Sequence, residues 1–475
     1  MARSQWHDRK RYLWPLGLLV PMLVFVAMAG LALTGWGIWA WIGPVFVFVL
    51  VPVIDLLTGV DESNPPDEAI PALEADPWYR WLTFLYLPMA YLGLAAAMWS
   101  IMTWDLPLAD RIGLAVTAGF VAAFGIVAGH ELGHKRDDVE RWLGKAALAP
   151  SAYGHFYLEH NRGHHVRVAT PDDPASSRLG ESFYAFLPRT VVGSLRSAWR
   201  LERARYALRG KHPWRPGNDV LNAWAFTVVL FAVIVVWLGI GVLPYLVLQA
   251  VVGFTLLEVV NYVEHYGLLR QRVGVAGYER YERVEPRHSW NANQIATNVL
   301  LYHLQRHSDH HANPTRRYQA LRDYPDAPQL PTGYAGMILL AVVPPVWRRV
   351  MDPRVVAHYD GDVRLANTGP RPRPRTLARL ERRFPPPAPR VTADLVGYGT
   401  VIRPSGQLLA DAAGVPGAAR MACPGCGWVY DEAVGAPREG FPAGTAWSSV
   451  PDTWCCPDCG VREKVDFVAV ASSPL

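Results

Sequence analysis

The stretch Leu304-Gln305-Arg306-His307-Ser308-Asp309-His310-His311 holds three histidines at positions i, i+3 and i+4. On an α-helix these positions share one face, so we expect the three imidazoles to converge on one point. Neutral imidazole is the commonest metal ligand among the side chains. The segment therefore predicts a metal site, and the rest of the chain must fold so as to complete it.

Three further histidine groups lie earlier in the chain. His130 and His134 are four residues apart, an H-x-x-x-H-H group follows at 160–165, and Asn261 precedes a histidine by four. A protein-bound metal ion takes about four to six ligands, so the set is too large for one ion and suits two. Histidine-rich sites with open positions favour a pair of irons. We expect two non-haem irons, with the ligands His130, His134, His160, His164, His165, His265, His307, His310 and His311.

Polar neighbours of these histidines are expected to orient them, because neutral imidazoles leave the charge of the ions uncompensated. Asn261 is a candidate to hold a metal-bound water. His303 lies one turn before the H-S-D-H-H run, where a supporting or packing role is favoured over a tenth ligand. The supporting residues we expect are Glu131, Glu159, Asn261, Glu264, His303 and Asp309.

One group also matches a competing motif. His130-Glu131-Leu132-Gly133-His134 fits the H-E-x-x-H pattern of zinc proteases, in which the glutamate is the general base. A protease would need one more ligand and would leave seven clustered histidines without a purpose. A single H-x-x-x-H is more often structural than metal-binding, but four groups together favour a metal centre.

Composition indicates an all-α integral membrane protein. Of 475 residues, 51% are hydrophobic and only 18% charged, and there are 19 tryptophans. Apolar runs of roughly membrane-spanning length predict six transmembrane helices, at 13–33, 38–57, 81–103, 112–128, 223–243 and 245–260. A cleavable signal peptide ending near residue 29 is the alternative, but the first apolar run continues past that point.

Shorter segments are expected to form a helical cap on this bundle. We predict capping helices at 151–165 and 299–311, and an interfacial segment at 336–350, where Pro344-Pro345 opposes a spanning helix. Asp55 and Glu258 are ionisable groups in or near predicted spans; helix pairing or ligand support is as plausible for them as catalysis. His7, His212, His288 and His358 show no metal spacing and are expected at the surface.

The distribution of Lys and Arg predicts the topology. Both are frequent at the N-terminus and in 135–215 but missing near 34–37, 105–110 and 240–244. The positive-inside rule then places the N-terminus, all four histidine groups and the C-terminus on the cytoplasmic side of the membrane, which we expect to be a bacterial inner membrane. The net charge of +5, without a basic stripe interleaved with aromatics, does not indicate a nucleic-acid partner.

The C-terminal part has a different character. We divide the chain into a membrane domain (1–352), a Pro/Arg-rich linker (353–420) and a small domain (421–475). Cys423-Pro-Gly-Cys426 and Cys456-Pro-Asp-Cys459 are two C-x-x-C knuckles, which bind zinc or iron through four thiolates. Spacing alone favours a zinc ribbon. Cys455 falls outside the pattern and is expected not to bind the metal.

The histidine motifs resemble those of the membrane alkane 1-monooxygenases, a branch of the superfamily that includes fatty acid desaturases and xylene monooxygenase. The motifs concerned are H-E-L-G-H-K (130–135), E-H-N-R-G-H-H (159–165), N-Y-V-E-H-Y-G (261–267) and L-Q-R-H-S-D-H-H (304–311). The resemblance implies a non-haem di-iron centre that uses O2 to hydroxylate the terminal methyl of n-alkanes to 1-alkanols. It also implies that the substrate enters from the bilayer between helices.

The residues around the knuckles, Gly427-Trp428-Val429-Tyr430-Asp431 and Pro451-Asp-Thr-Trp454, resemble rubredoxin. This resemblance implies one iron bound by Cys423, Cys426, Cys456 and Cys459, and a donor that carries one electron at a time. A tethered donor has a high local concentration at its acceptor. A separate flavin-dependent rubredoxin reductase using NAD(P)H is the expected partner. The rival interpretations are a fatty acid desaturase or aromatic-methyl hydroxylase, and a membrane-anchored electron-transfer protein with structural histidines.

Overall fold

The computed structural model describes residues 6–273, 280–370, 374–385, 419–424, 427–452, 454–458 and 462–470. Within them, six helical segments are long and apolar enough to cross a membrane: Trp14–Thr34, Gly37–Thr58, Pro77–Thr103, Leu108–Gly133, Asp219–Leu238 and Ile240–Glu264. These correspond one to one with the predicted spans. The fourth and sixth are longer than predicted, because each helix continues beyond its apolar run to carry polar residues.

Local sequence explains where these helices begin and end. Helix α1 (Leu19–Thr34) stops at Gly35, which has a positive φ of 68°. Glycine adopts this left-handed conformation more easily than any other residue. Helix α5 (Pro77–Thr103) starts where the Asp76 side chain accepts a hydrogen bond from the Trp78 amide, which satisfies one of the free amides at the helix start. Helix α11 (Asp219–Leu238) is capped in the same way by Asn218. The second span joins α2 (Ile42–Val45) and α3 (Val51–Thr58) through a π-helical turn.

Helix α6 (Leu108–Gly133) is the most buried span and packs against α5, α7 (Asp138–Ala147) and α12 (Leu243–Glu264). Its contact with α7 is made backbone to backbone. A Cβ atom on Gly144 would lie 3.0 Å from both the Gly129 carbonyl oxygen and the Gly133 amide nitrogen. Only glycine allows this approach, which fixes the end of α6 where the first predicted ligands lie.

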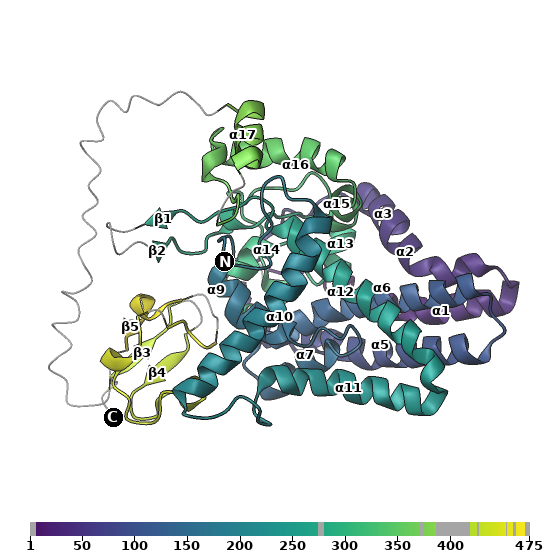
Figure 1. Ribbon diagram of the computed structural model, residues 1–475, viewed down its shortest axis with the longest axis horizontal. Helices are drawn as coiled ribbons and strands as arrows, with labels where there is room; N and C mark the ends of the chain where they lie inside the picture. Colours follow the sequence, from purple (N-terminus) through teal and green to yellow (C-terminus); the bar gives the residue numbers. More distant parts are fainter. Residues whose placement is uncertain are drawn as a thin grey trace, which may run out of the picture.

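The elements between and after the spanning helices gather at one end of them, and Figure 1 shows the C-terminal sheet on the same side of the molecule as α9. They are α4 (Ile70–Ala75), α8 (Phe156–Glu159), a π-helical turn (His160–His164), α9 (His165–Arg167), α10 (Phe183–Leu208), β1 (Arg272–Val273), β2 (Arg280–Tyr281), α13 (Ile295–Leu300), α14 (His307–Ala312), α15 (Tyr334–Ala341) and α16 (Pro344–His358). The predicted capping helices are therefore wrong in detail. Turns occupy 149–155 and 301–305, and each segment holds shorter helices.

Asp55 and Glu258, the two carboxylates singled out from the sequence, serve helix pairing. Asp55 on α3 accepts hydrogen bonds from the Thr297 amide (2.9 Å) and hydroxyl (2.5 Å), at the start of α13. Glu258 on α12 accepts from the hydroxyls of Tyr153 (2.7 Å) and Thr190 (2.8 Å).

One of the histidines expected at the surface is buried instead. His288 is 2% exposed, and its Nδ1 accepts a hydrogen bond from the Glu285 amide. Its ring also lies 3.1 Å from the Glu282 carboxylate, through Nε2. The prediction for His288 is therefore wrong, because lack of metal spacing does not distinguish a surface histidine from one that is buried with polar partners.

The C-terminal domain is a small antiparallel sheet of order β4-β3-β5, built from β3 (Arg420–Ala422), β4 (Val429–Asp431) and β5 (Val468–Ala469). Tyr430, Trp447 and Phe467 pack beneath it with the two buried cysteines that the structure describes. The first part of the predicted linker contains helical residues. Helix α16 continues past residue 352, and α17 (Pro374–Arg383) is tied back to it by an Arg383–Asp352 ion pair of 2.8 Å.

Candidate metal centre

All nine predicted histidine ligands lie in two adjacent groups. His130, His134, His160, His165 and His310 form the five-histidine site; His164, His265, His307 and His311 form the four-histidine site. All nine are buried, and within each group the potential ligand nitrogens lie within 4.8 Å of one another. Two groups of this size match the ligand needs of two ions.

The expectation that His307, His310 and His311 converge on one point is wrong. Nε2 of His307 lies 2.9 Å from Nε2 of His311, in the four-histidine site. His310 turns to the other site, where its Nε2 is 3.1 Å from Nε2 of His165. Consecutive helical residues diverge by about 100°, so a doublet cannot point at one ion. Helix α14 therefore lies between the two sites and supplies both.

The second histidine group is divided by a π-helical turn. The turn spans His160–His164, and it places residues five apart above one another instead of four. Nε2 of His160 consequently lies 3.1 Å from Nε2 of His165, both in the five-histidine site. His164 faces the four-histidine site. In a regular α-helix His160 and His164 would share a face, whereas the extra residue in this turn pairs His160 with His165 instead.

Two spanning helices deliver the remaining ligands at their ends. His130 and His134 close α6, in the five-histidine site. His265 follows α12 with a φ of -124°, outside the helical range, and its Nε2 lies 3.2 Å from Nε2 of His307. The point at which each of these helices ends therefore determines where its ligands lie.

The chemistry of these donors fits metal ions. Nε2 of His130, His134 and His164 is buried with no hydrogen-bond partner among the described residues, which is a costly state without a ligand. Other Nε2 atoms face one another at hydrogen-bonding distance. Burial, and then the neighbouring imidazoles, lower the pKa of His134 and His310 well below the usual value. These two rings are therefore neutral at pH 7, which is the form that binds metals.

A carboxylate that the sequence analysis missed orients one ligand. Oδ2 of Asp173 lies 2.9 Å from Nδ1 of His164 and also accepts a hydrogen bond from the Ser176 hydroxyl. A carboxylate on the far nitrogen fixes the tautomer and raises the basicity of the metal-facing nitrogen. Asp173 follows His164 in a loop, and loop conformation cannot be read from spacing.

A second supporting group reaches the four-histidine site from α12. Oε2 of Glu264 lies 3.3 Å from Nε2 of His307, while its Oε1 accepts a hydrogen bond of 2.8 Å from the Tyr334 hydroxyl. Glu264 was expected from the sequence and Tyr334 was not. Tyr334 begins α15, well beyond the last histidine group, and no motif connects it with Glu264.

Three carboxylates expected to support ligands make ion pairs elsewhere. Each adjoins a helical ligand, so the helix turns it about 100° away. The pairs are Glu131 with Lys135 at 2.9 Å, Asp309 with Arg316 at 2.7 Å and Glu159 with Arg167 at 2.7 Å.

The two remaining candidates, Asn261 and His303, are also engaged away from the ligands. Asn261 donates a hydrogen bond to Glu258. Both ring nitrogens of His303 have partners, with Lys10 Nζ at 2.7 Å and the Tyr318 carbonyl at 2.8 Å. These partners occupy both ring nitrogens, so a supporting or packing role for His303 stays the favoured prediction.

An apolar cavity lies between the spanning helices beside the four-histidine site. Its walls include Val47, Phe120, Phe124, Leu256, Leu300 and Tyr334. Tyr334 belongs both to this cavity and to the hydrogen bond with Glu264. Tyr334 therefore links the cavity wall, through Glu264, to His307 of the four-histidine site, and the walls suit a hydrocarbon rather than a polar ligand.

The cysteine site is described in part. Cys423 and Cys456 are each 1% exposed, whereas Cys426 and Cys459 lie outside the described residues. The backbone amide of Cys423 donates a hydrogen bond to the Trp428 carbonyl, 2.7 Å long. Burial raises the pKa of Cys455 to about 12, so this thiol stays protonated, as suits a residue that does not bind the metal.

Comparison with known proteins agrees with this geometry. Residues 111–341 match the fatty acid desaturase family and residues 420–467 match rubredoxin. The chain is 44% identical over 356 residues to alkane 1-monooxygenase 1 of Alcanivorax borkumensis, covering 75% of this chain and 87% of the relative. It is 44% identical over 376 residues to alkane 1-monooxygenase of Acinetobacter baylyi, covering 78% and 91%. The xylene/toluene monooxygenase hydroxylase component of Pseudomonas putida is 25% identical over 365 residues, covering 74% and 91%.

The fold and the histidine set thus define a multi-pass membrane monooxygenase of the desaturase-like class, with a di-iron centre and a fused one-iron rubredoxin domain. Within that class, the chain belongs to the alkane 1-monooxygenase family. The predicted fold class, enzyme class and cofactors are confirmed.

Proposed function

We propose that this protein hydroxylates the terminal methyl of n-alkanes to 1-alkanols with O2. The observation that carries the proposal is the apolar cavity between the spanning helices, whose wall residue Tyr334 bonds Glu264 beside His307 of the four-histidine site. A linear hydrocarbon lying in it would present one end to that site. The similarity to alkane 1-monooxygenases at 44% identity supports the same substrate class.

We assign one iron to the five-histidine site and one to the four-histidine site. Iron held there supplies the activation of O2. The chain's own residues do the rest: Asp173 fixes the tautomer of His164, and Tyr334 holds the Glu264 carboxylate toward His307. The buried walls keep bulk water from the reacting methyl. The third iron belongs to Cys423, Cys426, Cys456 and Cys459.

The electron supply and orientation are part of the same proposal. Each turnover takes two electrons and rubredoxin carries one, so a flavin-dependent rubredoxin reductase must recharge the domain from NAD(P)H. The concentration of Lys and Arg at the N-terminus and in 135–215 supports a cytoplasmic position for the histidine sites, the rubredoxin domain and both termini, in a bacterial inner membrane. We retain the division into a membrane domain (1–352), a linker (353–420) and a rubredoxin domain (421–475).

Two measurements on the purified full chain test the proposal. We expect about three irons per chain, whereas a membrane-anchored electron carrier with structural histidines would hold about one. Octane should yield 1-octanol by gas chromatography. An unsaturated fatty acyl product, or oxidation confined to aromatic methyl groups, would support the desaturase or aromatic-methyl hydroxylase alternative instead.

The Cys426→Ser variant separates the two domains in the same assay. It should lose turnover driven by the reductase while it keeps both irons of the histidine sites. Unchanged turnover in this variant would remove the rubredoxin domain from the mechanism.

A further inference from the structure

The rubredoxin domain contacts the membrane domain through ion pairs and hydrogen bonds that all have the same direction of charge. Arg162 Nη1 donates to both carboxylate oxygens of Glu439, each at 2.7 Å. Arg136 pairs with Asp458 at 2.5 Å, and Arg209 Nε donates to the Pro437 carbonyl at 2.7 Å. Arg283 and Asp466 form a further pair. In each contact the cation belongs to the membrane domain and the acceptor to the rubredoxin domain.

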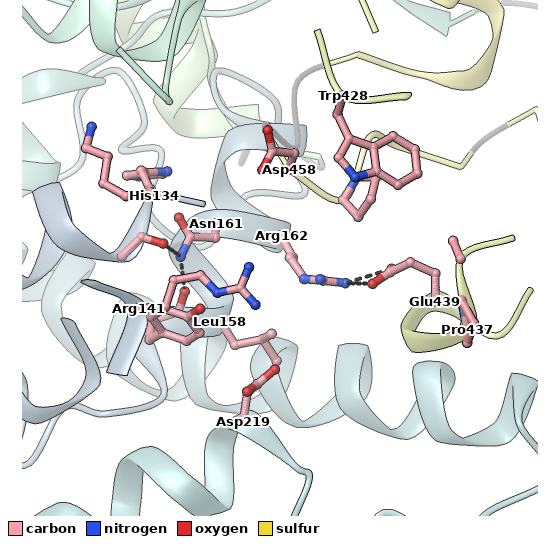
Figure 2. Close-up of a pocket in the computed structure, with 15 residues that line it drawn as sticks. His134, Arg141, Leu158, Asn161, Arg162, Asp219, Trp428, Pro437, Glu439 and Asp458 are labelled. Carbon is pink, nitrogen blue, oxygen red and sulfur yellow. Dashed lines mark hydrogen bonds and ion pairs between the residues drawn. The ribbon is translucent and has the colours of Figure 1, made fainter. Parts of the chain in front are cut away.

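A polar cavity of about 240 Å³ lies beneath these contacts. Figure 2 shows Arg162 reaching Glu439 across it, with His134 and Asn161 on one side and Trp428 on the other. His134 belongs to the five-histidine site. Among the described residues that line the cavity, none belongs to the four-histidine site.

The rubredoxin face toward this cavity is the face that holds its metal ligands. Trp428 lines the cavity, and its carbonyl accepts the hydrogen bond from the Cys423 amide. Pro457 also lines the cavity and directly follows Cys456. Both cysteines that the structure describes among the predicted iron ligands therefore lie next to residues that face His134.

Arg162 is placed to connect this seating with the metal centre. It lies within the π-helical turn His160–His164, so the residue that binds Glu439 shares a turn with a ligand of each histidine site. Two bonds from one guanidinium to one carboxylate fix orientation as well as distance. The side chains of Arg162 and Glu439 are 28% and 13% exposed. Solvent therefore screens this pair only in part.

We infer that the Arg162–Glu439 pair is the positioning contact that directs electrons from the rubredoxin domain to the five-histidine site, on the side of His134. The four-histidine site, which Tyr334 and Glu264 link to the wall of the apolar cavity, is the substrate side. The inference rests on the proposed function. In each transfer the rubredoxin iron is oxidised from ferrous to ferric and the accepting iron is reduced from ferric to ferrous; no bond forms and no proton moves.

Charge reversal in the full chain tests the positioning role. The rubredoxin iron is reduced with less than one equivalent of dithionite under anaerobic conditions, and its visible absorbance reports the return to ferric. Arg162→Glu and Glu439→Arg should each slow this return by about tenfold or more, because a close charge pair becomes a repulsive one. The double exchange should restore it to within about threefold.

Two controls accompany this experiment. Arg200→Glu makes the same charge change on α10, at an exposed position that takes no part in the seating contacts, and should leave the rate unchanged. The reduction of the rubredoxin iron by dithionite should be equal in all variants. Reversals without effect, or a double exchange as slow as either single variant, would overturn the positioning role.

Removing one ligand from each site tests the direction. His265→Ala should leave a chain whose rubredoxin iron still loses its electron, because the five-histidine site remains. His134→Ala should slow that loss by about tenfold or more, since the accepting iron loses a ligand. If His265→Ala slowed the loss of the electron more than His134→Ala, the inference would be overturned. The hydroxylase proposal would still stand, because octanol formation by the unaltered chain tests it separately.

Discussion

The five-histidine and four-histidine sites use the same side-chain type but have different surroundings. The five-histidine site faces a polar cavity through His134, opposite Trp428 of the rubredoxin domain. The four-histidine site is linked through Tyr334 to the wall of an apolar cavity and has two carboxylates near its ligands, Asp173 and Glu264. The two sites differ by one histidine, and the residues behind and beside the ligands distinguish them further.

The largest expected effect comes from removing one ligand of the four-histidine site. His265→Ala should lower the iron content by about one per chain and reduce octanol formation by more than about 100-fold, since even groups behind a ligand are worth about 10- to 100-fold in metal affinity. Iron analysis and gas chromatography measure both. His212→Ala, at an exposed position, is the matched control. Full iron content in His265→Ala would show that the two sites are not separate.

A smaller effect is expected from the carboxylate behind His164. Asp173→Asn keeps the shape but removes the charge, so the iron affinity of the four-histidine site should fall about 10- to 100-fold while the other site is unaffected. Competition with a chelator, followed by iron analysis, measures this. Asp172→Asn changes the exposed neighbour and should have no effect. Equal loss from both sites would mean that Asp173 stabilises the fold rather than one ion.

The smallest effect is expected at Tyr334, which links the four-histidine site to the wall of the apolar cavity. Tyr334→Phe removes the hydrogen bond to Glu264 but keeps the ring in the cavity wall. A hydrogen bond contributes about 0.5–1.5 kcal/mol net, so kcat should fall about two- to tenfold, with KM for octane and iron content unchanged. Tyr184→Phe is the control, because its hydroxyl bonds the Val342 carbonyl at the surface. A rise in KM with unchanged kcat would assign Tyr334 to substrate binding alone.

The sequence predicted what depends on spacing and composition. Six apolar runs were sufficient to predict the spans, and the nine histidines that the structure gathers into two groups were singled out by residue type and recurring spacing. The division of those ligands between two sites was not predictable, because it depends on a π-helical turn that H-x-x-x-H spacing does not reveal. Asp173 and Tyr334 were missed for a related reason: a loop and a separate helix bring them to the site from positions without sequence periodicity.

The carboxylates that neighbour the histidines in the sequence show a second limit of the prediction. Glu131, Glu159 and Asp309 were expected near the ions because they are next to ligands in the sequence. On a helix that argument fails, since a neighbour points about 100° away. Glu264 is the exception because α12 ends at Glu264, and His265 lies outside the helix.

The π-helical turn at His160–His164 has a consequence for how this enzyme can change over evolutionary time. A single surplus residue lets one short stretch of backbone serve two ions, and the guanidinium of Arg162 projects from the same stretch. Deleting one residue there would restore ordinary α-helical pitch and rotate everything downstream by about 100°. Surface loops generally tolerate length variation, whereas here the count of residues matters as much as their chemistry.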